Sequence, residues 1–407
     1  MTIFCGIDWA ESHHDVALVD ATGHLVAKRR ISDDPAGFAE LLNMLAAAGD
    51  TPQQPIPVAI ETPRGLLVAA LRATRRPIYA INPMAAARYR GRHSVSGKKS
   101  DHADAVMLAN ILRTDAHLHR QLPDDSDLAG AITVLARAQQ DATWRRSKAS
   151  NELRSLLREY FPTFLAAFAD RPATIASPEA RAVLAIAPTP EAAARLTRPR
   201  IAAALRRAGR VRGIDAAAET IKRALRQPQL RQRPLVEQAM GTHALALLAV
   251  LDTACTSVDQ LAQAVTEAFQ QHPDHAIITS FPGLGDLSGA RVLAELGDDR
   301  TRFADARAVK AYAGSAPITR SSGRSLSVTH RRIKNDRLAA AGWIWAFSAS
   351  NSCPPAREHY LRRREHGDGH PAALRNLFNR LIGCLHHCLT TRQTYDQNRA
   401  FPAFTPS

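Results

Sequence analysis

Residues 3–8 have the sequence Ile3-Phe4-Cys5-Gly6-Ile7-Asp8, a short apolar run that ends in a carboxylate. A run of this length is typical of a buried strand, although periodicity alone does not distinguish it from a buried helix segment. Asp is depleted in strands, and a buried carboxylate without a partner is costly in free energy. Asp8 therefore needs a partner at the strand edge, and a metal ion is one candidate.

The chain has an ordinary hydrophobic content but an unusually high positive charge. Its 407 residues suffice for two or three domains, and the hydrophobic fraction of 45% is ordinary for a globular protein. The formal net charge is +15 and the isoelectric point is near 10.3. Such a balance favours nucleic acid as a partner, the alternative being a solvated basic surface. Aromatic residues make up only 5% of the chain, so stacking on single strands is not the expected main device.

The cysteines show no regular spacing, which fits a reducing cytoplasm. Cys384 and Cys388 share a helical face, but no second ligand pair follows at zinc-finger spacing, so ordinary helix cysteines are favoured over a zinc site. The N-terminus lacks a signal-peptide pattern, and no apolar run reaches the ~18 residues of a membrane span. The sequence therefore predicts a cytoplasmic protein with no membrane partner.

Residues 1–126 are predicted to form an α/β domain with a mixed five-stranded sheet. The tight turn at 20–24 predicts that the first three strands form an antiparallel meander. Helices alternate with the later strands and are expected on the faces of the sheet. The expected strands are 3–8, 14–20, 25–31, 57–61 and 77–82.

Two pairs of carboxylates stand at positions that favour a shared site. Asp8 and Glu61 both end predicted strands, where open α/β sheets place their sites. Asp101 and Asp104 are three residues apart at the start of an apolar helix and share a face. Taken alone, the second pair is explained as well by a helix cap and a first-turn acid.

Four oxygen ligands of this kind would suit Mg²⁺, which leaves coordination positions free for phosphate. Two such ions about 4 Å apart can stabilise both the attacking and the leaving oxygen in phosphodiester chemistry. Lys98 and Lys99, just before the second acidic pair, would neutralise approaching phosphates. The sequence therefore predicts an Mg²⁺ site made by Asp8, Glu61, Asp101 and Asp104.

The middle of the chain is predicted to be helical. Long helices at 127–162 and 235–272 are expected to form a coiled coil, because Leu247, Leu251, Ala254, Val258, Leu261, Val265 and Ala268 follow a heptad spacing. That seam would pair either with the first long helix or with a second subunit. Between them, 163–234 is predicted to be a basic helical insertion, with twelve Lys and Arg residues against two acids, or +10, between 195 and 233. A disordered basic linker is the alternative.

Residues 273–392 are predicted to form an all-α domain, followed by a tail at 393–407. The sequence 280–285 contains Gly283 and Gly285 between two helices, as in a helix-hairpin-helix whose backbone N–H groups approach a phosphate; a plain helical turn is the alternative. A small-residue loop at 313–324 contains Ser322, either a nucleophile toward phosphorus or a polar serine in a phosphate-binding loop. The other predicted nucleic-acid contacts are Arg145, Arg146, Arg320, Arg324, Arg331, Arg332 and Lys334.

The motifs, taken together and in order, resemble the DEDD transposases, the insertion-sequence family numbered one hundred and ten. The resemblance covers roughly 1–165 and 235–390. It rests on Gly6-Ile-Asp8-Trp-Ala10, His13-His14-Asp15-Val16, Ile60-Glu61-Thr62, Ile81-Asn82-Pro83, Lys99-Ser-Asp101-His-Ala-Asp104-Ala105, Phe281-Pro-Gly-Leu-Gly285, Arg302-Phe303 and Tyr312-Ala-Gly314 through Pro317 to Ser322-Gly323. Ser315 departs from the pattern, because an apolar residue is more usual there.

The resemblance implies an RNase H-like (RuvC-like) N-terminal domain in which the four carboxylates hold Mg²⁺. It also implies a C-terminal domain whose serine attacks a DNA phosphate and forms a covalent phosphoserine link. The match places that serine at Ser322, with Ser321 as the neighbouring alternative. Members of the family act on double-stranded DNA as homo-oligomers that join one subunit's metal site to another's serine, and the better-understood ones are guided by a structured RNA.

Other function classes are compatible with parts of the pattern. A RuvC-like nuclease would use metals and water, with Ser322 structural, and a non-catalytic nucleic-acid-binding protein would have lost the acidic site. All four acids are present, which argues against that loss. An actin-like sugar kinase also opens with an apolar strand and Asp, but the Gly-Thr phosphate turn is replaced here by Trp9-Ala10-Glu11.

Overall fold

The computed structural model describes residues 2–402 except 94–100, 171–173 and 323–324. The chain divides into two compact units, Met1–Asp124 and Asp125–Ser407. Each unit has its own buried apolar clusters, so each is described by itself.

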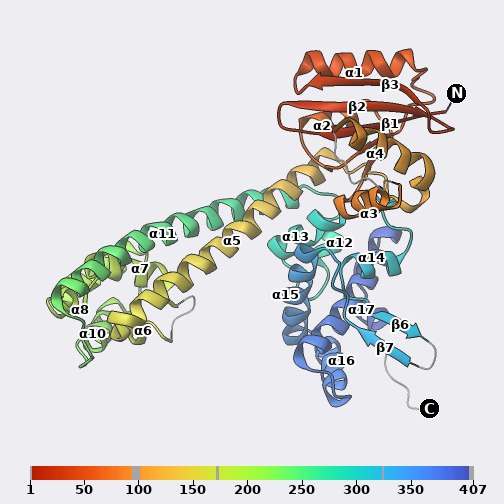
Figure 1. Ribbon diagram of the computed structural model, residues 1–407. Helices are drawn as coiled ribbons and strands as arrows, with labels where there is room; N and C mark the ends of the chain where they lie inside the picture. Colours follow the sequence, from red (N-terminus) through yellow and green to blue (C-terminus); the bar gives the residue numbers. More distant parts are fainter. Residues whose placement is uncertain (1, 94–100, 171–173, 323–324, 403–407) are drawn as a thin grey trace. The chain divides into compact units, whose positions relative to one another are not determined.

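The first unit contains the mixed five-stranded sheet that the sequence predicts (Figure 1). Strand β1 runs antiparallel to β2 and parallel to β4, and the strand order is β3-β2-β1-β4-β5. An Asp20 side-chain oxygen accepts hydrogen bonds from the backbone N–H of Thr22 and His24, which closes the turn between β2 and β3. The strands are β1 Ile3–Trp9, β2 His13–Asp20, β3 Leu25–Ser32, β4 Val58–Ile60 and β5 Ile78–Ala80.

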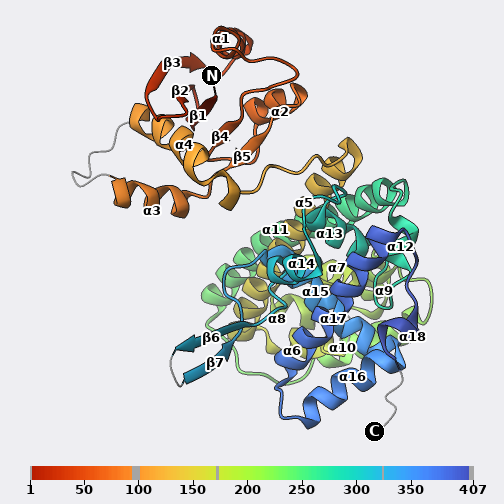
Figure 2. The ribbon, with the colours of Figure 1, turned by 90° about the vertical axis from the view of Figure 1, so that its right-hand side faces the viewer.

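Helices cover both faces of this sheet (Figure 2). Because side chains alternate along a strand, Ile3, Cys5 and Ile7 of β1 face one side and pack with α1 and α2. The other face packs against α3 and α4. The helices are α1 Pro35–Ala47, α2 Leu66–Ala73, α3 Pro83–His93 and α4 Asp101–Asp115, followed by the 3-10 turn η1 Ala116–Leu118.

Gly6 allows α4 to lie directly on β1. A Cβ atom at Gly6 would lie 2.0 Å from the carbonyl oxygen of Ala105 and 2.5 Å from the backbone nitrogen of Ala109. Both neighbours are backbone atoms of α4, so neither can move aside without moving the helix. The absence of a side chain at Gly6 therefore fixes how closely the start of α4 approaches the end of β1.

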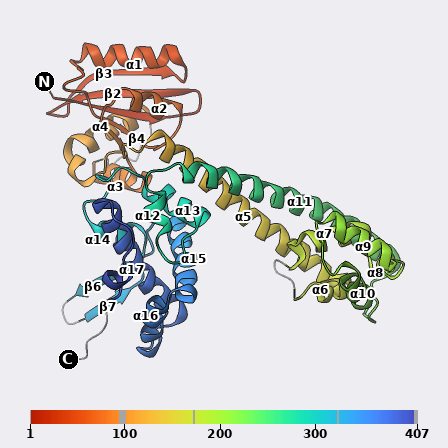
Figure 3. The ribbon, with the colours of Figure 1, turned by 180° about the vertical axis from the view of Figure 1, so that it is seen from behind.

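Two long helices, α5 (Asp127–Tyr160) and α11 (Pro234–Gln270), lie side by side in the second unit (Figures 1 and 3). Their seam is therefore made within one chain. Every second predicted position of the heptad, such as Leu251, is buried as expected. At three of the positions between them, the next residue along the chain is buried instead: Leu248, Cys255 and Phe269 are buried, whereas Leu247, Ala254 and Ala268 are half-buried. Either neighbour satisfies a three-four spacing, and the position of α5 decides which of the two is buried.

Residues between the long helices form a compact helical subdomain with its own core. Ile201, Leu205, Ile221 and Leu225 are buried there, as their helical spacing predicts, so the alternative of a disordered linker is wrong. Prolines stand in the first turn of four of its helices, where the missing N–H costs nothing. The elements are α6 Pro162–Ala167, η2 Thr174–Ala176, α7 Pro178–Ile186, α8 Pro190–Ala194, α9 Arg198–Arg207 and α10 Ile214–Leu225.

The remainder of the second unit is mostly helical but not all-α, which corrects the sequence prediction. Strands β6 (Ile318–Ser322) and β7 (Ser325–Thr329) form an antiparallel hairpin. Two short runs with β-branched residues flank a two-residue Gly-containing connection, a hairpin signal hidden by the many small residues. The helices are α12 His275–Thr279, α13 Asp286–Leu296, α14 Ala306–Tyr312, α15 Asp336–Ser352, α16 Pro354–Glu365, α17 His370–Thr391 and α18 Gln397–Ala400.

Gly283 and Gly285 lie between α12 and α13, in the segment predicted to be a helix-hairpin-helix. Gly283 has φ +80°, and a Cβ atom there would lie 2.6 Å from the backbone nitrogen of Ala349 in α15. The N–H of Gly285 donates to Ser288 Oγ at 3.0 Å. Packing against α15 therefore explains Gly283, and phosphate binding by this turn stays a prediction.

By length and composition alone, α11 is apolar enough to cross a membrane, which holds for no other described helix. A helix with one face packed in a protein core meets the same test, and α11 buries such a face against α5.

Replacing Gly6 with Ala is expected to destabilise the first unit by about 3 kcal/mol, because its Cβ would overlap the backbone of α4. Urea unfolding of both variants would measure this loss. Gly91→Ala is the matched control: no atom lies within 4 Å of its Cβ position, so no loss of stability is expected. Equal stability of both variants would contradict the close contact.

Candidate functional site

Asp8 and Glu61 lie at neighbouring strand ends of the first unit. The last registered pair of the parallel strands β1 and β4 is Ile7 with Ile60, and each acid follows directly. Both alternate with residues that pack against α1 and α2, so both belong to the face that α3 and α4 cover. The two carboxylates are half-buried. The structure therefore brings together the two strand-end acids that the sequence singled out.

Asp104 joins this face from the first turn of α4. It is buried, and its neighbour Ala105 is the residue against which Gly6 packs, two positions before Asp8 in β1. Its Oδ1 accepts a hydrogen bond from Arg90 Nη2 of α3 at 2.6 Å. The side chain is therefore held by a cation in this structure.

Asp101 is the first residue of α4, three positions before Asp104. The backbone therefore places both positions on one face of the helix, as predicted. Its side chain lies outside the described part of the structure, as do residues Lys98 and Lys99.

Asp15 is a buried carboxylate that sequence reasoning did not single out. It pairs with Asp8 in the β1–β2 register, so both face the same side of the sheet. Arg30, opposite Asp15 on β3, donates to its two oxygens at 3.2 and 2.7 Å. The signal in the sequence was a carboxylate within the second predicted strand, directly before the apolar residues 16–19. Arg30 thus neutralises the acid next to Asp8.

The donor chemistry of this face fits Mg²⁺, which prefers carboxylate oxygens. Within the described residues, however, no group of three or more His, Cys, Asp or Glu side chains is arranged closely enough to hold a metal ion. Two facts bear on this: Arg90 engages Asp104, and the side chain of Asp101 is not described. The ligand types therefore fit, while their present arrangement is not a complete ligand set.

Ser322 lies in the second unit, as the last residue of β6 and exposed. It pairs with Ser325 of β7 at the end of the hairpin. Arg324 lies outside the described residues, and the side chains of Arg320 and Ser321 are not described. The serine predicted in a loop thus stands at a strand end, with its backbone fixed by the neighbouring strand.

A polar network closes the base of this hairpin. The backbone N–H of Asn335 donates to the carbonyl oxygen of Tyr312 at 2.8 Å. Its side-chain Nδ2 donates to the Tyr312 hydroxyl at 2.6 Å. The same Nδ2 donates to Glu295 at 2.7 Å, and Arg137 binds both oxygens of Glu295 at 2.8 Å. That hydrogen bonding raises the pKa of Arg137. Because Tyr312 ends α14 and Asn335 caps α15, the network holds together the two ends of the segment that contains Ser322.

Ser315, which departs from the family pattern, is buried at the start of this segment. Its hydroxyl lies 3.0 Å from Asn379 Oδ1 and 3.2 Å from the carbonyl oxygen of Lys310, so it can donate to either. A polar residue is thus accommodated because both possible partners are acceptors.

The other predicted basic contacts lie in the second unit. Arg145 on α5 and Arg332 are exposed, whereas Arg146 and Arg331 are half-buried. Lys334 forms an ion pair with Asp336 at 2.7 Å. Arg337, which was not predicted, lies over the ring of Trp144 at 5.2 Å and pairs with Asp141. These cations are available for phosphate contacts to different degrees, since the last two are already partnered.

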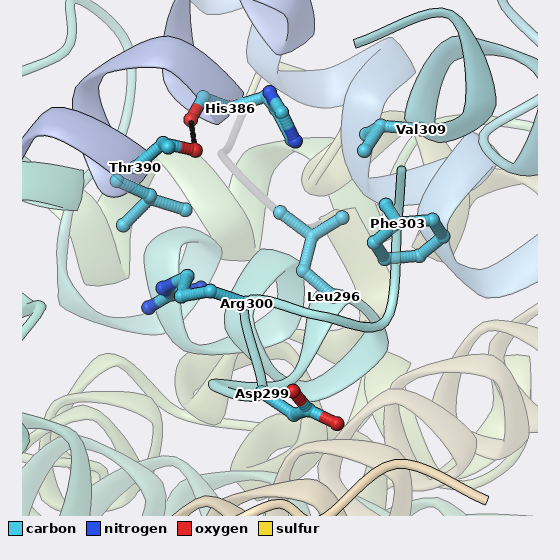
Figure 4. A pocket seen from close by; sticks show the side chains of 8 residues that line it. Leu296, Asp299, Arg300, Phe303, Val309, His386 and Thr390 are labelled. Atoms are coloured by element: carbon cyan, nitrogen blue, oxygen red, sulfur yellow. Dashed lines mark hydrogen bonds between the residues drawn. The ribbon is translucent and has the colours of Figure 1, made fainter. Parts of the chain in front are cut away.

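A small pocket lies between α13, α14 and α17 (Figure 4). Leu296, Phe303 and Val309 line it together with Arg300, whose guanidinium pairs with the buried Asp274. Its volume of about 20 Å³ holds about one water molecule. This pocket is therefore no substrate site.

Arg137→Ala is expected to lower the free energy of unfolding by about 3 kcal/mol, because it leaves the buried Glu295 without its cation. The midpoint of urea unfolding of the full chain measures this effect. Arg145→Ala, an exposed arginine on the same helix, is the matched control and should leave the midpoint unchanged. A midpoint for Arg137→Ala equal to that of the control would show that the network does not stabilise the hairpin base.

Comparison with known proteins places both units in one group. Residues 5–162 match a transposase family model, DEDD transposase of IS110, and residues 275–361 match the model of the IS116/IS110/IS902 transposase family. The chain is 59% identical to the mini-circle putative transposase for IS117 of Streptomyces coelicolor, over 98% of this chain and 97% of that protein.

More distant relatives match over almost the whole chain as well. An uncharacterized 43.6 kDa protein of insertion element IS110 from Streptomyces coelicolor is 28% identical over 97% of this chain and 95% of its own length. An uncharacterized 42 kDa protein of insertion element IS900 from Mycobacterium paratuberculosis is 26% identical over 97% of both chains. These matches confirm the resemblance seen in the motifs: the chain belongs to the IS110 family of insertion-sequence transposases.

Proposed function

We propose that this transposase cuts and rejoins double-stranded DNA with Mg²⁺ held by Asp8, Glu61, Asp101 and Asp104, and with Ser322 as the nucleophile. The observation that carries the proposal is the placement of Asp8, Glu61 and Asp104 on one face of the sheet. The sheet order supports an RNase H-like fold, since an antiparallel meander continues into two parallel strands.

The four carboxylates would hold Mg²⁺ at the ends of β1 and β4 and at the start of α4. When bound, the ions would supply charge stabilisation at the attacking and leaving oxygens of the phosphodiester. Arg90 would release Asp104 or share it, because its guanidinium now occupies one carboxylate oxygen. Arg30 would keep Asp15 neutralised, so that Asp15 does not compete as a ligand.

Ser322 would attack a DNA phosphate through Oγ, displacing the deoxyribose oxygen of one strand and forming a phosphoserine link. A serine hydroxyl is a weak nucleophile until a base or a metal activates it. Its exposed position at the end of β6 supports access by a DNA strand. Serine and carboxylates lie on separate units of the chain, so activity would depend on correct assembly of the homo-oligomer.

The basic helical subdomain would bind phosphates of nucleic acid. Exposed arginines of α9, α10 and their flanks have no carboxylate within ion-pair distance among the described residues: Arg198, Arg200, Arg206, Arg207, Arg212 and Arg223. A row of such cations releases counterions when it meets a phosphate backbone. The partner would be the element's DNA or a structured guide RNA, as the family resemblance implies. We expect these events in the cytoplasm, where all five cysteines stay free.

A covalent protein–DNA adduct tests the serine. Full-length protein is incubated with Mg²⁺, duplex DNA of the element's end and its flanking transcript, and the products are separated on a denaturing gel. An adduct is expected with the wild type and with Ser321→Ala, and none with Ser322→Ala. Cleavage without adduct, equal in all three proteins, would instead support a metal-dependent nuclease that uses water.

The carboxylates are tested by substitutions that keep their shape. Asp8→Asn and Glu61→Gln are each expected to slow DNA cleavage by roughly a hundredfold or more and to weaken Mg²⁺ binding in calorimetry, because each removes a charged ligand. Glu40→Gln is the matched control, since Glu40 is on α1 at the opposite face of the sheet. Unchanged Mg²⁺ binding in both site variants would refute the metal site.

A further inference from the structure

A hollow in the second unit collects positive charge that the proposed chemistry does not use. It lies between α14, α17 and the segment 392–400. Lys310 of α14, Arg380 and His387 of α17, and Arg399 of α18 line it. Helices α14 and α17 pack against each other, which fixes two of its walls.

Gly383 in the middle of α17 makes room for Lys310. A Cβ atom at Gly383 would lie 2.6 Å from Lys310 Cε and 2.9 Å from its Nζ. Glycine inside a helix is unfavourable, by about 1 kcal/mol relative to alanine. Here its missing side chain lets the ammonium group of a half-buried lysine rest against the helix, beside the hollow.

Three of the cations that line the hollow form no ion pair with the described residues. Lys310, Arg380 and Arg399 have no carboxylate within ion-pair distance among the described residues. Arg380 donates to the carbonyl oxygen of Ala400 at 2.5 Å and lies over the Phe401 ring, which orients it without neutralising it.

Two further charged residues line the hollow. Arg392 pairs with the buried Asp274. Asp396, the acid in the lining, accepts from the backbone N–H groups of Asn398 and Arg399 as the cap of α18. Three cations thus face one hollow in which the carboxylate is engaged in capping, an arrangement that an anion would stabilise.

The hollow is also tied to the chain that leads to Ser322. The carbonyl oxygen of Lys310 accepts hydrogen bonds from the backbone N–H of Ser315 at 3.1 Å and of Ala316 at 3.2 Å. Strand β6, which ends at Ser322, begins two residues later. The residue that carries the ammonium group therefore also anchors the root of the serine hairpin.

We propose that Lys310, seated against Gly383, forms with Arg380 and Arg399 a binding site for a backbone phosphate of the DNA strand on which the hairpin acts. The proposal rests on the proposed DNA chemistry and adds a contact that holds the strand at the hairpin root. Lys310 and the two arginines bind and position the strand, whereas bond breakage remains with Ser322.

Gly383→Ala is the sharpest test, because it removes no charge. Its Cβ would displace the flexible end of Lys310, which can swing away at little cost to stability. Affinity of the full-length protein for the duplex DNA of the element's end is measured over a series of salt concentrations. Gly383→Ala and Lys310→Ala should each weaken binding about five- to tenfold and lower the log–log salt slope by about one.

Lys28→Ala, an exposed lysine of β3 in the other unit, is the matched control and should change neither quantity. DNA affinity equal to wild type in both Gly383→Ala and Lys310→Ala would overturn the site while leaving the serine chemistry intact. Binding of inorganic phosphate is also measured by calorimetry. If Gly383→Ala and Lys310→Ala lose phosphate binding but keep the DNA affinity of the wild type, the proposed DNA contact is overturned in favour of a site for a free anion. Failure of the wild type to bind DNA at all would refute the proposed function itself.

Discussion

The contact between Gly6 and the backbone of α4 is the constraint on which the candidate site depends. Any side chain at Gly6 would meet Ala105 and Ala109, so the helix can approach β1 only because position 6 is glycine. This approach places Asp104 on the same face as Asp8, while the parallel register of β1 and β4 adds Glu61. Backbone geometry thus places the acids on one face. Arg30 pairs with Asp15, the neighbour of Asp8, and Arg90 pairs with Asp104 itself.

In the second unit, side-chain contacts hold the two-stranded hairpin β6–β7 in place. A two-stranded hairpin is marginally stable by itself. Tyr312 and Asn335 hold its two ends together, and the ion pair of Arg137 with Glu295 anchors both to α5 and α13. The Lys310 carbonyl oxygen accepts hydrogen bonds from the backbone N–H groups of Ser315 and Ala316, just before β6. The root of the hairpin is therefore held by hydrogen bonds to the helices around it, and Ser322 lies at the far end of β6.

The sequence was sufficient for the elements whose signal is local. The apolar strands, the Asp20 turn and the long helices of the middle of the chain were all predictable, because alternation, turn residues and helical spacing decide them. The hairpin at Ser322 was missed because small residues obscured its alternation. The seam of α11 matches the prediction at Leu251, Val258 and Val265 and differs at the positions between them, because the position of α5 decides which neighbour is buried. The ion pairs of Asp15 with Arg30 and of Asp104 with Arg90, and the contact of Lys310 with Gly383, depend on pairing across the fold, which no local pattern reveals.

The central claim is that a serine of the hairpin becomes joined to DNA. The most direct measurement is mass spectrometry of the wild-type protein after reaction with the element's end DNA, nuclease trimming and proteolysis. The account predicts a nucleotide remnant on Ser322, located by fragmentation against Ser321. A remnant on a residue outside the hairpin, or cleaved DNA with no modified peptide, would contradict it.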